Sequence, residues 1–530
     1  CGTCLPDNRK TASQIKSLTM THLHFIGIGG IGMSGLAAMC ADSGYTVTGS
    51  DRGAERPENR RIIDALELQG IRIYPQDGSY IRDGRPDLLV YSTAIEEGNA
   101  DFAAGAGIDR IHRSQLLERV IRESGFECSI AVTGSCGKST VTAYLAEALT
   151  NLGADPSCLD GALIKRFIGG RYAGNYRHGA GKYFVFEADE SDKSLVNYSP
   201  DYAIILNLGC DHYEKDELVR VFGEFLAKVK KGAVLEREVY ELVRPRLKPG
   251  FPVRVIDASP RPDSQFAVEE YRILTRTDAI YSQGGRRERL APSGDRAVTD
   301  TIGATNLLSI YGMRSEGFRL ESRLPVARFT GGRKLELPQP GFHMAMNALA
   351  IDALLEWIGF DPAETIEALE RFDGVWRRND YAGLTASGAT VYDDYAHNPE
   401  KIVSCFRAMR EMGDGNIYAV FQPHGYAPFG FMRDQLYLEI EPELRNNDRF
   451  ILLPPYYAGG TSSFRPKPEE VLADWQSRCR RPERFMYFPN RELLTDFLLL
   501  QSKPGDTIVI MGARDNSLSD YAASLTGEKP

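Results

Sequence analysis

Apolar runs that end in a glycine-rich turn and lead into a helix-like segment recur along the chain. The first run, His24–Ile28, is followed by a helical pattern as far as Ser43 and by a second apolar run, Tyr45–Ser50. The run Leu88–Tyr91 continues the same alternation. Strand, turn and helix in this order are typical of doubly wound α/β domains built on a parallel sheet. We therefore expect a Rossmann-like N-terminal domain over residues 20–122.

Two further regions repeat this pattern. The second region opens with Cys128–Thr133 and includes the runs Tyr183–Ala188 and Tyr202–Asn207. The third region begins near Ala389 and ends with the run Thr507–Met511. The predicted fold class is therefore α/β, with three domains in series.

The expected domain boundaries follow from these regions. We assign residues 123–376 to a central domain and residues 377–530 to a Rossmann-like C-terminal domain. Residues 240–335 are rich in Arg, Pro and Gly and show short alternating runs, so we expect a β-rich insertion there. Residues 1–19 are polar and are expected to form a disordered tail.

Length and charge narrow the function classes. At 530 residues the chain exceeds the size of one hydrophobic core, so several domains are expected. A net charge of −9 argues against a broad nucleic-acid-binding surface. No stretch approaches the roughly 18 apolar residues of a membrane span, so we expect no membrane partner.

Cysteine usage indicates a reducing compartment. The nine cysteines are an odd number scattered over a long chain, which does not suggest a disulfide framework, and we expect a cytoplasmic protein. Cys1 and Cys4 have CxxC spacing, but no second metal half-site accompanies them, so redox or zinc chemistry is set aside. We expect a monomer or a weak homodimer.

The first glycine turn carries a dinucleotide fingerprint. Gly27-Ile-Gly29-Gly30-Ile-Gly32 follows a strand and opens a helix, and Asp51 ends the next strand. The glycines let backbone N–H groups approach a pyrophosphate at a helix N-terminus. The motif indicates a phosphate-binding turn but does not identify the ligand that carries the phosphate. NAD, another bound nucleotide and simple tight packing all remain open.

The second glycine turn has the Gly-Lys-Ser arrangement that wraps a triphosphate. In Thr133-Gly134-Ser135-Cys136-Gly137-Lys138-Ser139-Thr140, Lys138 would contact the β and γ phosphates and Ser139 would bind magnesium. Val132 stands where the first glycine of a Walker A motif usually lies, so this is a shorter variant. The turn predicts a P-loop ATPase domain.

Acidic residues cluster after the two strands that follow. They are Glu187, Asp189, Glu190 and Asp192, and then Asp211 with His212. Carboxylate oxygens and one imidazole suit magnesium beside phosphates, and a strand would aim Glu187 at the P-loop edge of the sheet. Solvated surface charge is the alternative interpretation.

The motifs together resemble the Mur ligase family, and most closely its alanine-adding members. The resemblance covers almost everything from Met20 onward. Besides the blocks above, it rests on Tyr91-Ser92-Thr93-Ala94-Ile95, Gly341-Phe342-His343 with Asn347, Arg377-Arg378, and Asp393-Asp394-Tyr395-Ala396-His397-Asn398-Pro399.

The resemblance implies that the first domain binds UDP-N-acetylmuramic acid rather than NAD. The substrate-binding residues that it implies are Gly29, Gly30, Gly32, Met33, Ser34, Ser50, Asp51, Ser92, Thr93, Ala94, Tyr395, His397 and His424. An amino acid is the implied second substrate.

ATP and Mg²⁺ are the implied cofactors. ATP would contact Gly134, Ser135, Gly137, Lys138, Ser139, Thr140, Asn347, Arg378 and Asp394. Ser139, Glu187 and His212 would ligate the metal, and Lys138, Glu187, His212 and Arg378 would be catalytic. For His343, structural and catalytic roles both remain open.

The implied reaction is ATP-dependent carbon–nitrogen bond formation through an acyl phosphate, which adds L-alanine or another small L-amino acid during peptidoglycan precursor synthesis. Ligation of a recycled murein peptide to the same UDP-sugar is the alternative reaction. A nicotinamide oxidoreductase would leave the P-loop idle. A noncatalytic UDP-sugar-binding protein would need a decayed ATP site, yet Lys138, Glu187 and His212 are all present.

The chain departs from the family pattern in its third domain. Asn398 stands where a second histidine is usual, and Asn379 stands where an aromatic residue usually follows the arginine pair. Two arginines that hold the amino acid's carboxylate usually come soon after the Gln-Pro-His segment, but here no arginine follows His424 until Arg433. Two interpretations remain open: either Arg433 takes over, reached by a short insertion through Pro428–Phe431, or the natural acceptor differs from alanine. In either case Pro428, Phe429 and Phe431 would line a more apolar pocket.

Overall fold

The computed structural model describes residues 21–56, 59–190, 194–208, 215–283, 286–290, 318–456 and 465–526. The predicted tail, residues 1–19, lies outside this part of the chain. The chain divides into two compact units, each of which is described separately below. The first unit comprises residues 1–269, 328–335 and 345–376; the second comprises residues 270–327, 336–344 and 377–530.

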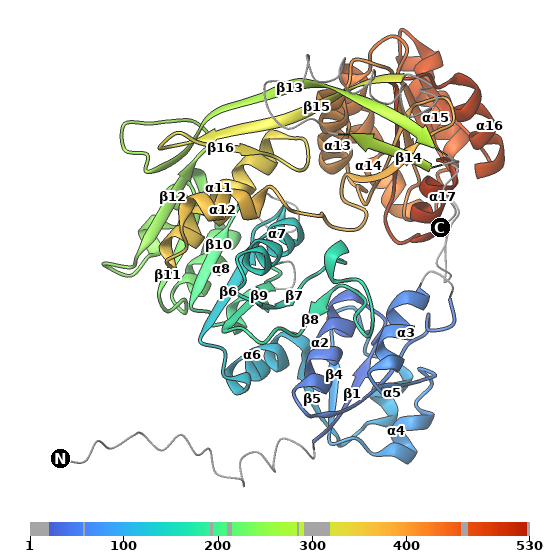
Figure 1. Cartoon of the computed structure of the whole chain (residues 1–530). Helices are drawn as coiled ribbons and strands as arrows, with labels where there is room; N and C mark the ends of the chain where they lie inside the picture. Colours follow the sequence, from blue (N-terminus) through green and yellow to red (C-terminus); the bar gives the residue numbers. More distant parts are fainter. Residues whose placement is uncertain are drawn as a thin grey trace. The chain divides into compact units, whose positions relative to one another are not determined.

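The first unit begins with a five-stranded parallel sheet (Figure 1) in the order β3-β2-β1-β4-β5. Its strands are β1 (His22–Ile26), β2 (Thr46–Ser50), β3 (Arg72–Tyr74), β4 (Leu88–Tyr91) and β5 (Asp109–His112). Its helices are α2 (Ile31–Asp42), α3 (Arg60–Leu68), α4 (Ser79–Gly84), α5 (Ala100–Ala104) and α6 (Arg113–Ser124). The expected strands are present within about two residues of their predicted ends, a normal margin for such assignments.

The central region of the same unit carries most of the larger sheet. Its strands are β6 (Cys128–Thr133), β7 (Ser157–Leu159), β8 (Tyr176–Arg177), β9 (Tyr183–Glu187), β10 (Tyr202–Ile205), β11 (Gly232–Glu236) and β12 (Val253–Asp257), followed by β13 (Phe266–Gln283), β14 (Arg286–Leu290), β15 (Phe318–Phe329) and β16 (Arg333–Glu336). Its helices are α7 (Lys138–Asn151), α8 (Lys215–Leu226), α9 (Arg237–Val243), α11 (Phe342–Trp357) and α12 (Pro362–Leu369). The strand order is β16-β15-β13-β12-β11-β10-β6-β9-β7-β8, with β14 beside β13. Strands β13 to β15 belong largely to residues of the second unit.

The N-terminal and central regions share one hydrophobic core, which explains why they form a single unit. Helix α2 is apolar almost all round because it is buried, with Leu36, Ala37 and Met39 nearly inaccessible to solvent. Gly35 of α2 lies so close to Leu159 of β7 that a Cβ there would stand 2.6 Å from its side chain. The close approach of this helix to the central sheet therefore requires glycine.

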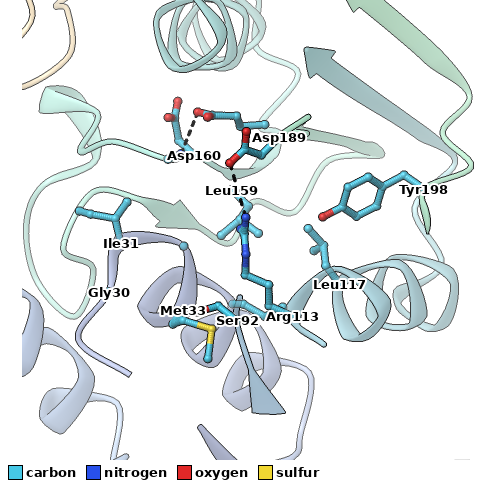
Figure 2. Close-up of a pocket in the computed structure, with 14 residues that line it drawn as sticks. Gly30, Ile31, Met33, Ser92, Arg113, Leu117, Leu159, Asp160, Asp189 and Tyr198 are labelled. Atoms are coloured by element: carbon cyan, nitrogen blue, oxygen red, sulfur yellow. Dashed lines mark hydrogen bonds and ion pairs between the residues drawn. The ribbon is translucent and has the colours of Figure 1, made fainter. Parts of the chain in front are cut away.

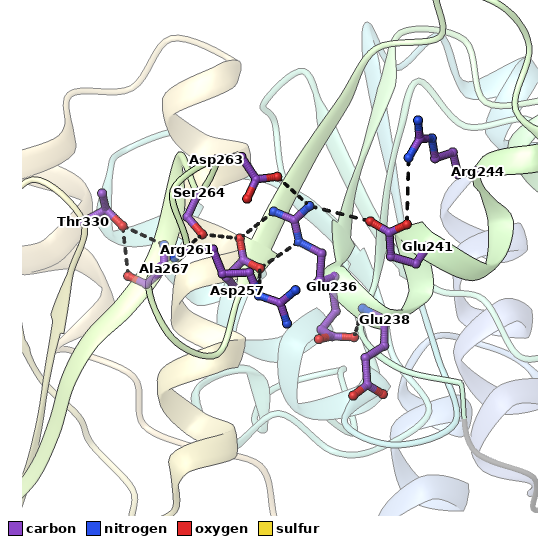
Figure 3. Close-up of polar contacts among 11 residues, drawn as sticks. Glu236, Glu238, Glu241, Arg244, Asp257, Arg261, Asp263, Ser264, Ala267 and Thr330 are labelled. Atoms are coloured by element: carbon purple, nitrogen blue, oxygen red, sulfur yellow. Dashed lines mark hydrogen bonds and ion pairs between the residues drawn. The ribbon is translucent and has the colours of Figure 1, made fainter.

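The predicted β-rich insertion over residues 240–335 is present but begins later than expected. Residues 237–243 and 244–246 are helical, and strands resume only at Val253. A buried ion-pair network joins the carboxyl ends of β11 and β12 at this point (Figure 3): Arg237 donates to both oxygens of Asp257 at 2.8 and 2.9 Å, and Ser264 donates to the same carboxylate at 2.6 Å. Residues 291–317 of the insertion lie outside the described residues.

The second unit is built on a sheet of order β17-β18-β22-β19-β20-β21, in which only β17 is antiparallel to its neighbour. Its strands are β17 (Asp380–Leu384), β18 (Thr390–Asp394), β19 (Ile417–Phe421), β20 (Arg449–Leu452), β21 (Phe485–Tyr487) and β22 (Thr507–Met511). Its helices are α13 (Pro399–Met412), α14 (Tyr426–Ile440), α15 (Pro468–Arg478), α16 (Arg491–Gln501) and α17 (Ser517–Ser524). Helices α13 to α15 share one core and α16 and α17 another, as in a doubly wound fold. Short 3-10 turns occupy Lys165–Phe167, Ser194–Asn197, Arg244–Arg246, Glu441–Glu443 and Pro482–Arg484.

The chain passes between the two units five times, after Glu269, Ala327, Leu335, Met344 and Trp376. Within the second unit, the strand residue Tyr271 donates a hydrogen bond to the Glu411 carboxylate on α13. The N–H of Gly341, just before α11, bonds to both of these side chains at 3.0 Å. The insertion is therefore part of the second unit as well as of the first. Over the described residues, no helix is both long and apolar enough to cross a bilayer.

Candidate active site

The glycine turn between β1 and α2 has the geometry that its motif predicts. Gly27 adopts a φ of +77°, which favours glycine, and its N–H bonds to the Ser50 carbonyl at 2.8 Å. The carboxylate of Asp51 accepts the N–H of Gly29 at 2.8 Å and that of Gly53 at 2.7 Å. Asp51 therefore holds the turn in shape, a role distinct from the ligand contact that the resemblance implies.

A pocket of about 290 Å³ lies in the first unit beside this turn (Figure 2). It opens at the carboxyl ends of β1, β4 and β5, which are neighbours in the sheet, and β1 and β4 meet where the strand order reverses. Ligands of α/β sheets bind at such a switch point. The lining includes four predicted substrate residues and the predicted metal ligand: Gly30, Gly32, Met33, Ser92 and Glu187.

The remaining lining residues add an arginine and an apolar wall that sequence reasoning missed. Arg113, the first residue of α6, points across the pocket toward Asp189 of the central region (Figure 2), and Tyr198 lines the far side. The strand before Arg113, Asp109–His112, has only one aliphatic residue, so no apolar run marked it. A sheet edge tolerates such a polar strand because one side of it faces solvent.

Six predicted substrate residues of the first unit do not line the pocket: Gly29 and Asp51, described above, and the four described next. Ser34 is buried, donates to the Ile31 carbonyl at 3.0 Å and accepts from Asn175 at 2.8 Å. Ser50 is buried and donates to Asp101. Thr93 and Ala94 are exposed just beyond β4. The two serines therefore shape the fold around the pocket, and any ligand contact by these four residues stays a prediction.

The second glycine turn lies between β6 and α7, as its motif predicts. Gly134 and Gly137 have φ values of +133° and +86°, which only glycine adopts easily. Asn207, which follows β10, clamps the turn: its side chain accepts the N–H of Cys136 at 2.8 Å and donates to the carbonyl of Cys136 at 3.0 Å. Sequence reasoning did not assign Asn207 a role, because an asparagine after a strand more often caps or ends an element.

Lys138 lies in an acidic surrounding at the start of α7. Its Nζ is 2.9 Å from Glu190 Oε2 and 3.8 Å from Asp189 Oδ1, and it donates to the Gly134 carbonyl at 2.9 Å. Burial lowers the pKa of Lys138, but Glu190, Glu187 and Asp189 together outweigh burial and raise it. The ammonium therefore stays charged at neutral pH, as a phosphate clamp must.

Two predicted magnesium donors are placed. Glu187 ends β9 and lines the pocket, and one of its carboxylate oxygens accepts the Gly161 N–H at 3.1 Å. Ser139 is half-buried in the first turn of α7. Oxygen donors from one or two side chains fit Mg²⁺, which usually keeps several waters and phosphate oxygens as ligands.

The predicted third magnesium donor, His212, lies outside the described residues, as do Asp192 and Asp211. No three His, Cys, Asp or Glu side chains gather as a metal site in the described part of the chain. The complete ligand set therefore stays a prediction.

Asn347 lies beside the P-loop, and its contact with the nucleotide stays a prediction. It is buried on α11, and its Oδ1 would stand 3.6 Å from a Cβ added to Gly137. In the second unit, the exposed ring of His343 folds over Gly341, where an added Cβ would meet it. That packing favours the structural role for His343.

The predicted arginine pair divides into a buried and an accessible member. Arg377 is fully buried, pairs with Asp393 at 3.1 Å and donates to the carbonyls of Gly512 and Asp515. Arg378 is only partly buried and lies over the ring of Tyr395, 5.2 Å from its centre. Arg378 is therefore the more accessible member of the pair, and its contact with a phosphate stays a prediction.

Asp394, at the end of β18, is engaged by the backbone. Its carboxylate accepts the N–H groups of Asn379 and Ala396, both at 2.7 Å, and burial raises its pKa. Asn379 has a φ of +44°, a conformation that asparagine adopts more readily than an aromatic residue. The departure from the family pattern at Asn379 is thus explained by the turn that it occupies.

Two histidines follow neighbouring strands of the same sheet. The rings of His397 and His424 meet edge to face at 5.3 Å. Burial lowers the pKa of His397 to about 4, and burial followed by the charge of Arg514 lowers that of His424. Both imidazoles are therefore neutral at pH 7. The positive charge around them comes from Arg378, Lys401 and the exposed Arg514, the last two of which sequence reasoning missed.

Residues Pro428–Phe431 belong to the continuous helix α14, and their being an insertion relative to the family stays a prediction. Residues two apart on a helix point about 200° away from each other. Phe429 accordingly packs in the core against Trp475, whereas Phe431 is 93% exposed, so they line no common pocket. Arg433 lies 3.6 Å from Asp434, which partly satisfies its charge.

Comparison with known proteins assigns the class. The description "Mur ligase family, catalytic domain" matches residues 22–124, "Mur ligase middle domain" matches residues 132–235, and "Mur ligase, glutamate ligase domain" matches residues 377–514. The chain belongs to the Mur ligase family. Its predicted ligase class and its α/β regions in series are thereby confirmed.

Individual relatives are consistent with this. The UDP-N-acetylmuramate–L-alanine ligase of Methylobacterium nodulans is 31% identical over 514 residues, 96% of each chain. Among solved structures, the UDP-N-acetylmuramate–alanine ligase of Thermotoga maritima has a TM-score of 0.69 at 23% identity, covering 95% of this chain and 98% of that one. A murein peptide ligase of Psychrobacter arcticus has a TM-score of 0.59 at 20% identity, covering 96% and 99%.

Proposed function

We propose that this protein is an ATP-dependent ligase that joins L-alanine or another small L-amino acid to the carboxylate of UDP-N-acetylmuramic acid. The observation that carries the proposal is one pocket that combines Gly30 and Ser92 of the N-terminal sheet with Glu187 of the central sheet. Lys138 lies beside Asp189 of the same pocket. A UDP-sugar held at the first glycine turn would thus present its far end to the phosphate site.

A carboxylate does not react with an amine, so the reaction needs activation by phosphoryl transfer. The substrate carboxylate attacks the γ phosphorus of ATP, which forms an acyl phosphate and releases ADP. The amine then attacks the acyl carbon, and inorganic phosphate and a proton leave as the amide forms. Lys138 would stabilise the negative charge that shifts onto the phosphate oxygens in both steps. Mg²⁺ held by Ser139 and Glu187 would supply further positive charge.

The incoming amino acid has a carboxylate of its own to be neutralised. In the second unit, Arg378, Lys401 and Arg514 carry positive charge near Tyr395 and the His397–His424 pair. We propose that Arg514 takes the place of the arginines that are absent after His424.

One observation favours a second candidate, the joining of a peptide to the same UDP-sugar. Asn398 and the arginine-free start of α14 depart from the pattern of the alanine-adding members. Phosphate release with UDP-N-acetylmuramic acid, ATP and a panel of alanine, glycine, serine, larger amino acids and the murein tripeptide decides between them. Activity with small amino acids supports the first candidate; activity with the tripeptide alone moves the assignment to the second.

Lys138→Ala tests the phosphate site in the same assay. Loss of a phosphate-clamping charge should cost several kcal/mol of transition-state stabilisation, roughly a thousandfold or more in turnover. Binding of UDP-N-acetylmuramic acid should survive, because the first glycine turn remains intact. Full turnover in the purified variant would overturn the ATP site, and tight NAD binding with no response to the UDP-sugar would overturn the first pocket.

The proposed substrates also bear on the binding partners, the compartment and the oligomeric state of this protein. We propose that ATP, Mg²⁺, UDP-N-acetylmuramic acid and an amino acid are this protein's partners in the cytoplasm, with no nucleic-acid or membrane partner. The predicted monomer or weak homodimer belongs to the same proposal.

A further inference from the structure

Three charged side chains of the first unit lie in a row between the pocket and the P-loop. Arg113 Nη2 is 3.7 Å from Asp189 Oδ2, an approach drawn in Figure 2. The other oxygen of the same carboxylate, Oδ1, is 3.8 Å from Lys138 Nζ. Asp189 is therefore shared by a cation that faces the pocket and a cation that faces the phosphate turn.

The surroundings of the row make these charges sensitive to one another. The side chains of Arg113, Asp189 and Lys138 are 24%, 31% and 14% exposed, so solvent screens them only in part. Lys138 has a second, buried partner in Glu190 at 2.9 Å. Arg113 reaches over the first glycine turn, with Nη1 3.0 Å from a Cβ built on Gly32.

We propose that Asp189 is a positioning residue that couples the two binding sites by holding Arg113 back from the anionic group of the UDP-sugar. The inference rests on the proposed function, because it takes the pocket's ligand to be a phosphate- and carboxylate-bearing sugar nucleotide. Arg113 binds that anion, and Asp189 competes for Arg113 when the pocket is empty.

The strength of that competition depends on Lys138. While the ammonium of Lys138 lies beside Asp189, it neutralises part of the carboxylate charge and loosens the hold on Arg113. When phosphates draw Lys138 away, Asp189 is left to Arg113 and the pocket binds its anion less tightly. A divalent cation beside Glu187 would return the missing positive charge. Nucleotide without metal should therefore oppose UDP-sugar binding.

Calorimetric titration with UDP-N-acetylmuramic acid, without nucleotide or metal, tests the coupling as a double-mutant cycle. Asp189→Asn, which removes the charge and keeps the shape, is expected to tighten binding roughly five- to tenfold. Lys138→Met is expected to weaken it roughly two- to fivefold. The double variant should match Asp189→Asn alone, since the proposed coupling of Lys138 to Arg113 runs through Asp189.

Matched variants separate charge from shape. Lys138→Arg keeps the charge and should bind the UDP-sugar as the wild type does. Arg113→Gln should weaken binding more than about tenfold, because a charge-assisted contact is lost. Arg122→Gln, a neutralisation on the same helix at a side chain that is 67% exposed, is the control and should leave binding unchanged. Melting temperatures confirm folding, and Lys138→Gln and Asp189→Ser replace any variant that does not fold.

The possible results separate a failure of this inference from a failure of the proposed function. Weaker or unchanged binding in Asp189→Asn overturns the inference. An effect of Lys138→Met that persists when Asp189 is already neutral also overturns it, because the coupling would then bypass Asp189. If the wild type itself does not bind UDP-N-acetylmuramic acid, the proposed function fails instead.

Discussion

Burial changes the protonation state of one carboxyl group in this protein, that of Glu147. Glu147 lies on α7, nine residues beyond Lys138, and is fully buried. One oxygen accepts the N–H of Asp373 at 2.9 Å, and the other has no partner among the described residues. Burial raises the pKa of Glu147 from 4.5 to about 8, so the carboxyl group is protonated at neutral pH.

This residue predicts a loss of stability toward alkaline pH. Between about pH 4.5 and pH 8 the folded state binds a proton that the unfolded state has lost, so the free energy of unfolding falls as pH rises through that window. Each pKa unit between the folded and the unfolded state corresponds to about 1.4 kcal/mol in the free energy of unfolding. Glu147→Gln, which stays neutral and can still accept the Asp373 N–H, should flatten the profile.

Thermal melts of both proteins at about pH 5 and about pH 8.5 make the measurement. The melting temperature of the wild type should fall more between these values than that of Glu147→Gln. Parallel curves would mean that the carboxylate ionises without cost, which would contradict its burial in a dry site.

At the acceptor end, the cation that replaces the absent arginines can be identified by kinetics. Charge-assisted hydrogen bonds to a carboxylate contribute roughly 1.5 to 3 kcal/mol, or about ten- to a hundredfold in affinity. Arg514→Gln should therefore raise the KM for the amino acid and leave the KM for UDP-N-acetylmuramic acid unchanged. Arg433→Gln is the matched comparison. If Arg433→Gln raises the amino-acid KM and Arg514→Gln does not, the assignment passes to Arg433.

Individual residues also show which departures the sequence could not explain. Asn379 looked anomalous because its motif position usually holds an aromatic residue, and only its φ of +44° reveals why asparagine suits it. Arg113 follows strand β5 and Asn207 follows strand β10. What these two side chains lie next to depends on which strands are neighbours in the sheets. A single sequence does not reveal such pairing, whereas it did mark Lys138 and Glu187 by local pattern alone.

At the scale of elements, helix α13 depends on the residue that precedes it. Asn398 accepts the N–H of Lys401 at 2.9 Å, and Pro399 occupies the first helical position. Asparagine is among the best N-cap residues, and proline at that position lacks an N–H that would otherwise be unpaired. The position where relatives carry a second histidine is thus used here to start a helix.

Removal of this cap should be measurable in the whole protein. Asn398→Ala is expected to lower the free energy of unfolding by about 1 kcal/mol, within a range of roughly 0.5 to 2 kcal/mol. Urea unfolding followed by circular dichroism gives the value, and Asn398→Asp, which can still cap, is the control. Equal losses in both variants would show that Asn398 does something other than capping.

Strands were predictable where the sequence has a continuous apolar run. Leu88–Tyr91, Cys128–Thr133 and Thr507–Met511 are strands with the predicted ends, because both faces of a parallel sheet are covered. Helix α14 was not recognised at its start because Pro428 reads as a break. Its position in the first turn is harmless, since the N–H groups there have no partner in the helix.

At the scale of the molecule, the second unit is assembled from three stretches of chain: residues 270–327, 336–344 and 377–530. A division at Trp376 therefore leaves part of the second unit on the N-terminal piece. Co-expression of residues 1–376 and 377–530 as two chains should yield a complex, because Tyr271 and Gly341 on one chain still bond to Glu411 on the other.

Size-exclusion chromatography with an affinity tag on either piece measures this association. Glu411→Gln, which removes the charge that Tyr271 and the Gly341 N–H share, should weaken it, and Glu443→Gln, at an exposed pair with Arg407, is the control. Independent elution of the two pieces would contradict the division of the chain described above. The sequence did not predict the interleaving, since the motif within residues 270–344, Gly341-Phe342-His343, does not indicate which part of the chain it packs against.

The interleaved chain also restricts how such a protein can change during evolution. A single recombination near codon 377 would replace residues 377–530, yet it would retain residues 270–327 and 336–344, which belong to the same unit. The chimera would lose the complement of Glu411 unless the donor carried the same surface. New acceptor preferences are therefore expected to arise by point substitution around Arg514 and His424 rather than by exchange of whole modules.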